Sequence, residues 1–146
     1  MSRHTARIHV MNLVFQFPFH PDWDQTALTN ATVNYLTDLP DLEGIIRNLT
    51  PDDGDRAFIE AEAYGTFAHL PQIDALIDGR LKDWGLDRIA KIDLALLRLA
   101  VYEIRYAEDI TPGTAINEAV ELAKVYGTDD SPSFINGVLG QVARSG

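Results

Sequence analysis

Residues 128–140, TDDSPSFINGVLG, place an aromatic side chain and an amide directly after an acidic turn. Phe134 can stack on a flat ligand, and Asn136 can both donate and accept hydrogen bonds. Gly137 and Gly140 each cost about 1 kcal/mol relative to alanine in a helix, so we expect them to allow the close approach of another backbone or of a ligand. The plainer interpretation is a phenylalanine at the edge of the core and an asparagine that hydrogen-bonds between helices.

The chain has no motif typical of a catalytic site. It contains no cysteine, which excludes disulfides, thiolate zinc sites and cysteine nucleophiles. It has no phosphate-binding loop, no glycine-rich dinucleotide turn and no His-Glu-x-x-His motif. The spacing of His4 and His9 does not suit two metal ligands on one helix face, His20 lies in the turn-rich segment 18–25 with two prolines, and His69 has no ligand at helical spacing. We therefore expect surface or boundary histidines, no catalytic residue, no metal, no cofactor and no enzymatic activity.

Charge is unevenly distributed along the 146 residues, which have a formal net charge of −10. Residues 1–21 include Arg3 and Arg7 and no acidic residue, whereas residues 22–79 have twelve acidic residues against two arginines. This asymmetry suggests one anionic and one cationic partner, and the alternative is a merely solvated acidic surface. There is no signal peptide and no run of about 18 apolar residues, so we expect a cytoplasmic protein without a membrane partner.

Helical periodicity recurs along the whole chain and predicts an all-α fold in a single domain, residues 1–146. The strongest element is 87–106, with Asp87 as its expected N-cap and with Asp93 and Glu103 projecting from its apolar arc. Thr111 is expected to cap the next helix, which Gly127 ends. The predicted helices span 4–17, 27–37, 41–49, 54–69, a segment from Pro71 to about Trp84, 87–106, 112–126 and a last helix from Ser131.

Four segments resemble a known family in their order and spacing. They are RHTARIHVMNLVFQ (3–16), WGLDRIAKIDLALLRLAVYEI (84–104), AINEAVELAKVYG (115–127) and FINGVLG (134–140). Together they are similar to the bacterial transcription antitermination factor NusB family. The resemblance implies an all-α fold of two packed three-helix sub-bundles. It also implies binding to boxA-type single-stranded RNA of ribosomal RNA leader transcripts, together with a small-subunit ribosomal protein acting as NusE, in an RNA polymerase antitermination complex.

The resemblance also implies an RNA site where the first and last helices meet. By position, its residues are Arg3, Arg7, Phe15, Asp130, Phe134 and Asn136. The arginines would neutralise phosphates, and the aromatic side chain of Phe134 would stack on an unpaired base. The family usually has more basic residues in the first helix, and a lysine where this chain has Pro132 and Ser133. We therefore expect weak RNA binding by the chain alone, with the partner protein supplying positive charge.

Two alternatives to this function remain at the level of the sequence. One is a helical protein-interaction module with little RNA binding of its own, for which a homodimer that hides its first helix is one form. The other is an accessory domain of an RNA cytosine methyltransferase. The chain contains no methyl-donor-binding domain, which argues against the second alternative.

Overall fold

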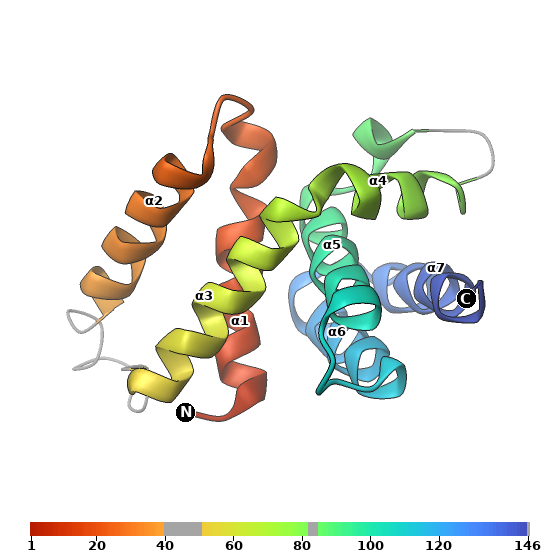
Figure 1. Cartoon of the computed structure of the whole chain (residues 1–146). Helices are drawn as coiled ribbons and strands as arrows, with labels where there is room; N and C mark the ends of the chain where they lie inside the picture. Colours follow the sequence, from red (N-terminus) through yellow and green to blue (C-terminus); the bar gives the residue numbers. More distant parts are fainter. Residues whose placement is uncertain (40–50, 82–84, 146) are drawn as a thin grey trace. The chain divides into compact units, whose positions relative to one another are not determined.

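The computed structural model describes residues 1–39, 51–81 and 85–145, and in these residues the secondary structure is helical with no strand (Figure 1). The chain divides into an N-terminal unit, Met1–Ala68, and a C-terminal unit, His69–Gly146. The predicted all-α fold is confirmed. The predicted helix 41–49 lies outside the described residues. No helix in the described ranges is long and apolar enough to cross a membrane.

The N-terminal unit contains α1 (Arg3–Phe15), the 3-10 turn η1 (Phe17–Phe19), α2 (Gln25–Asp38) and α3 (Asp53–Ala68). Two side chains fix the helix starts, because Ser2 Oγ accepts from the Thr5 N–H and Asp24 Oδ1 accepts from the Ala27 N–H. The helix α3 packs against both α1 and α2. The three predicted helices are confirmed to within a few residues at each end.

One polar cluster lies between α1 and α2, and it corrects our expectation for His9. We expected every histidine at the surface or its boundary, but His9 is only 4% exposed. The Tyr35 hydroxyl lies 2.7 Å from His9 Nδ1 and accepts a 2.9 Å hydrogen bond from Asn12 Nδ2. Its proton is therefore available to the imidazole. His9 and Asn12 of α1 thus share Tyr35 of α2, a partner that periodicity alone could not identify.

Burial of His9 makes the stability of the protein depend on pH. Desolvation lowers the pKa of this imidazole from its usual value of 6.5. The unfolded chain therefore binds more protons, so the free energy of unfolding should fall as the pH decreases from about 7.5 through 6.5 toward the lowered pKa. We expect His9→Gln to reduce this dependence in denaturant titrations between about pH 7.5 and pH 5.5. The exposed His20 gives the control, His20→Gln; a decrease that His9→Gln leaves unchanged would contradict the assignment.

The C-terminal unit contains α4 (Leu70–Asp78), the 3-10 turn η3 (Leu86–Arg88), α5 (Lys91–Tyr106), α6 (Pro112–Tyr126) and α7 (Ser131–Arg144). The central helix is α5, which packs against α4, α6 and α7. The expected cap at Asp87 is wrong, because this residue belongs to η3 and α5 begins after Ala90 without a side-chain cap. The expected cap at Thr111 is confirmed by its 3.2 Å bond from the Thr114 N–H.

Polar side chains of α5 connect it to the neighbouring helices. Arg98 donates two 2.9 Å hydrogen bonds to the carboxylate of Asp74 on α4, in the bidentate geometry that guanidinium and carboxylate groups favour. Arg105 donates to the carbonyl oxygen of Val142 on α7 at 2.9 Å. Glu103, expected to be buried, is 1% exposed. The last helix buries a stripe of apolar residues at helical spacing, Ile135, Val138, Leu139 and Val142.

The turn between α6 and α7 requires glycine at position 127 for steric reasons. A Cβ added there would lie 2.5 Å from Ser131 Oγ and 2.9 Å from the carbonyl oxygen of Ala123. The same Ser131 Oγ accepts a 2.9 Å hydrogen bond from the Thr128 N–H, which closes the turn. The turn therefore fixes the start of α7 against the end of α6.

The glycines of α7 correct one part of another expectation, the close approach of a second backbone, while the approach of a ligand stays a prediction. A Cβ added at Gly137 would meet nothing within 4 Å, and one at Gly140 would approach only the side chain of Arg144, on the same helix. Within the described residues, then, no other backbone approaches these glycines closely. Gly137 instead leaves an exposed and open position on α7.

Two glycine substitutions test this steric difference. Gly127→Ala should lower the free energy of unfolding by about 1–3 kcal/mol, because Ser131 or the backbone must move. Gly137→Ala should raise it by about 0.5–1 kcal/mol, because alanine is the better helix former and meets no neighbour. Denaturant unfolding of both variants beside the parent protein measures the two changes. Equal stability of the two variants would contradict the close packing at Gly127.

Candidate nucleic-acid interface

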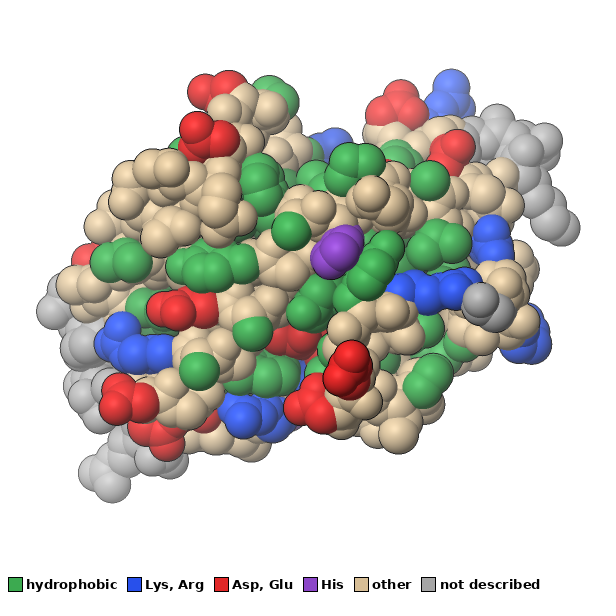
Figure 2. Space-filling view, in the orientation of Figure 1, with side chains coloured by type: hydrophobic (Ala, Val, Ile, Leu, Met, Phe, Trp, Pro, Cys, Tyr) green, Lys and Arg blue, Asp and Glu red, His purple; other side chains and the backbone are tan. Residues whose placement is uncertain are grey.

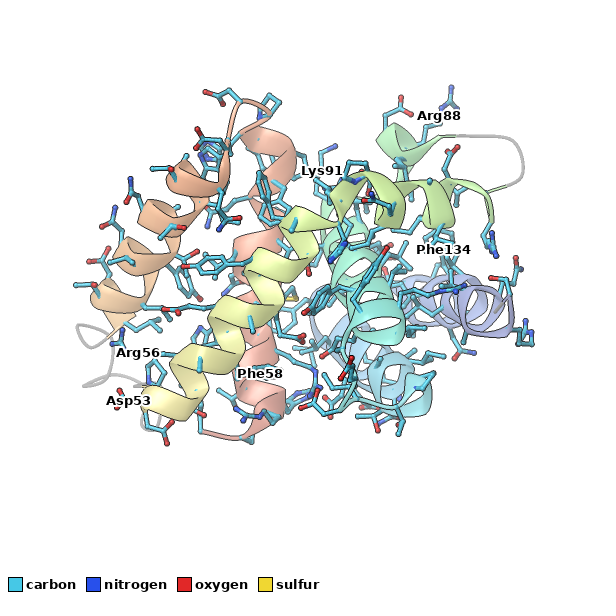
Figure 3. All side chains as sticks on the ribbon, in the orientation of Figure 1. Asp53, Arg56, Phe58, Arg88, Lys91 and Phe134 are labelled. Carbon is cyan, nitrogen blue, oxygen red and sulfur yellow. The ribbon has the colours of Figure 1, made fainter. Side chains whose placement is uncertain are left out.

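The first turns of α1 form a basic end in the N-terminal unit. The side chain of Arg3 is 56% exposed, with its Nη1 3.8 Å from Asp55 Oδ1. Its guanidinium carbon lies 4.5 Å from the centre of the Phe58 ring on α3 (Figure 3). Arg7 lies 5.4 Å from the same ring centre but is only 5% exposed. Of the two predicted arginines, Arg3 is therefore the one that presents its charge to solvent.

The carboxylate of Asp55 is held by groups other than Arg3. Its Oδ2 accepts hydrogen bonds from the N-terminal ammonium of Met1 at 3.2 Å and from the Asp52 N–H at 3.0 Å. Burial alone would raise the pKa of Asp55, but the backbone N–H of Asp52 and the charged N-terminus outweigh it and hold this pKa below its usual value. Asp55 is therefore an ionised structural anchor at this end of α1.

Phe15 lies at the opposite end of α1 from Arg3, about 18 Å away along the helix axis. Its ring packs against Phe19 of η1, with centroids 5.5 Å apart and planes at 54°. Phe19 is 58% exposed, which makes it one of the most exposed large apolar side chains among the described residues. The neighbouring His20 and Trp23 stack in parallel at 4.3 Å. This end of α1 therefore presents aromatic surface, whereas the other end presents charge.

A cavity of about 320 Å³ opens in the C-terminal unit between the start of α5 and the turn before α7. It is bounded by apolar, hydroxyl and carboxylate side chains. The lining residues are Ile89, Ala90, Asp93, Thr128, Asp130, Ser131 and Phe134. Two of the predicted RNA-binding residues, Asp130 and Phe134, thus share one cavity.

Asp93 is the distinctive polar group of this cavity. It is 7% exposed, and its Oδ1 is buried without a hydrogen-bond partner among the described residues. A buried acceptor without a partner is costly, and such groups are rare in folded proteins. Phe134, half-buried at the cavity, adds a flat apolar surface. The cavity therefore suits a flat molecule that carries a hydrogen-bond donor.

Two cations flank the cavity in sequence and were not among the predicted site residues. Arg88 and Lys91 lie on either side of the lining residues Ile89 and Ala90, and both are exposed (Figure 3). They are exposed cations next in sequence to the lining of the cavity. The sequence showed Asp93 projecting from an apolar arc, but only the folded turn brings this part of α5 beside the start of α7.

Asn136 occupies a different side of α7 from Phe134. Residues two positions apart on an α-helix point in directions that differ by about 200°. Asn136 is exposed and does not line the cavity. The structure therefore joins Asp130 with Phe134 and places Arg3 and Arg7 over one ring. Phe15 lies at the other end of α1 from Arg3, and Asn136 lies on a different side of α7 from Phe134.

The fold and these two surfaces define the class of protein, an all-α protein with a basic helix end and an aromatic cavity. Comparison with known proteins identifies the family. The NusB family model matches residues 4–144. The transcription antitermination protein NusB of Agathobacter rectalis is 40% identical over 98% of this chain and 100% of its own. That of Bacillus velezensis is 38% identical over 97% of this chain and 95% of its own. The chain belongs to the NusB family.

Solved structures agree with this assignment. NusB of T. maritima matches with a TM-score of 0.78 at 32% identity, covering 99% of this chain and 92% of that one. A structure of the antitermination factors NusB and NusE in complex with dsRNA matches with a TM-score of 0.77 at 20% identity, covering all of both chains. The second likeness concerns the fold alone.

Proposed function

We propose that this chain is a transcription antitermination factor that binds boxA-type single-stranded RNA together with a ribosomal protein acting as NusE, within an RNA polymerase antitermination complex. Membership of the NusB family supports the proposal, because relatives named as antitermination proteins align with nearly the whole chain. Residues 1–146 act in this proposal as one RNA-binding domain. The role is one of binding, with no catalytic group.

The observation that carries the proposal is the cavity between Asp93 and Phe134. An unpaired base that enters it can stack on the half-buried phenyl ring, a contact that typically contributes about 1–3 kcal/mol. The amino or imino hydrogens of the base can then donate to the carboxylates of Asp93 and Asp130, which line the cavity. Single-stranded RNA is the form whose bases are free to enter such a site.

The remaining polar residues have roles along the RNA backbone. To Arg88 and Lys91, which flank the lining residues Ile89 and Ala90 in sequence, we assign contacts with the phosphates on either side of the bound base. In the N-terminal unit we assign a phosphate contact to Arg3 and a supporting position beneath it to the buried Arg7. Phe15, with its aromatic neighbour Phe19, and Asn136 on α7 are assigned further RNA contacts.

The protein partner is proposed on charge. Residues 22–79 hold most of the excess negative charge, and Figure 2 shows acidic side chains spread over several separate parts of the visible face. Such a surface attracts a basic ribosomal protein and increases its association rate. The same partner can add cations where this chain has few.

Replacement of Phe134 tests the function at the cavity. Phe134→Ala should weaken binding to a boxA-like RNA about five- to hundred-fold in the presence of the NusE-type protein, because the stacking contact is lost. Leu139→Ala is the control, since Leu139 is fully buried in the same helix and its truncation should cost about 2–5 kcal/mol of stability. Fluorescence anisotropy and thermal melting of both variants separate the two effects. An unchanged RNA affinity in Phe134→Ala would reject the cavity as the RNA site.

A further inference from the structure

Phe58 of α3 lies beneath two arginines of α1. The guanidinium carbons of Arg3 and Arg7 are 4.5 Å and 5.4 Å from its ring centre, both within the range of a cation–π interaction. Arg3 and Arg7 are four residues apart and so share one face of α1, while Asp55 and Phe58 are three apart and share one face of α3. All four residues belong to the N-terminal unit, in which α1 packs against α3.

The distances show that Arg3 relies on the ring more than on a carboxylate. Its Nη1 is 3.8 Å from Asp55 Oδ1, which is beyond hydrogen-bond distance. Asp55 is already bound by the N-terminal ammonium and by the Asp52 N–H. Among the described residues no hydrogen bond uses the donors of Arg3, and its side chain is 56% exposed. A guanidinium held by its flat face keeps the N–H groups at its edge available to an anion.

A free arginine side chain samples many rotamers, and ordering it on binding opposes affinity. A ring beneath the guanidinium restricts those rotamers before the anion arrives. The second cation at the same ring, Arg7, is 5% exposed and holds the ring from the buried side. The arrangement therefore prepares one exposed cation at the start of α1.

We propose that Phe58 is a positioning residue for RNA binding, which holds Arg3 in the orientation that contacts a phosphate. This inference rests on the proposed RNA-binding function. Phe58 itself touches no RNA and acts through Arg3. Its benzene ring is the required feature, so tyrosine should replace it and leucine should not.

A double-mutant cycle tests the coupling between the two residues. The proteins are the parent, Arg3→Ala, Phe58→Leu and the double variant, each titrated with a boxA-like RNA in the presence of the NusE-type protein. We expect Arg3→Ala to weaken binding about three- to tenfold and to reduce the slope of log K against log salt by about 0.7, the value for one lost phosphate on a single strand. Phe58→Leu should give most of the same loss, and the double variant should lose little more than Arg3→Ala alone.

Two further variants separate positioning from general stability. Phe67→Leu removes another α3 aromatic, one that packs on Phe17 at 5.4 Å and on no arginine of the described ranges. This variant should lower the melting temperature without changing RNA affinity. Phe58→Tyr should restore the affinity that Phe58→Leu loses. Additive losses in the cycle, or no effect of either single variant while Phe134→Ala still weakens binding, would overturn the role of Phe58. If Phe134→Ala binds the RNA as tightly as the parent protein, that result would instead reject the proposed function itself.

Discussion

Electrostatic repulsion between an acidic chain and a polyanion is the constraint on which the proposed RNA site depends. The chain has a net charge of −10, so its overall field opposes RNA. At physiological ionic strength that field is screened beyond about 8 Å, and only charges close to the ligand decide binding. The exposed cations at the two surfaces therefore matter more than the total. Arg3 sits on an aromatic ring at one surface, and Arg88 and Lys91 flank an aromatic cavity at the other.

The buried and half-buried carboxylates show how the same charge serves two purposes. Asp74 is paired with Arg98 and Asp55 with the N-terminal ammonium, so both stabilise packing between helices of their own unit. Asp93 differs because it lines a cavity and its buried Oδ1 has no hydrogen-bond partner among the described residues. An acceptor without a partner lowers the stability of the free protein. The same acceptor gains a hydrogen bond when a ligand donor enters. This difference separates the groups that hold the fold from the group that we assign to the ligand.

Helix positions, caps of the Thr-Pro type and the core stripe of α7 were predictable because they depend on residues close in sequence. The family resemblance added the class of protein, and the comparisons confirm it. Burial of His9, the wrong cap at Asp87 and the open surface at Gly137 depend on contacts between helices, which periodicity does not contain. The same holds for the orphaned oxygen of Asp93 and for the ring of Phe58 beneath two arginines. The six predicted site residues remain a proposal, of which Asp130 and Phe134 now have a cavity in common.

The salt dependence of RNA affinity is the most direct test of whether a few exposed cations of this chain, helped by a basic partner, hold the RNA. We assign about three phosphate contacts to the free chain, from Arg3, Arg88 and Lys91. A plot of log K against log salt should therefore have a slope no steeper than about −2 for single-stranded RNA. Addition of the NusE-type ribosomal protein should raise the affinity and steepen the slope, because the partner adds cations. Anisotropy titrations of a boxA-like RNA at several salt concentrations, with and without the partner, give both slopes. Equal affinity and equal slope with and without the partner would contradict the claim that the partner supplies cations to the RNA site.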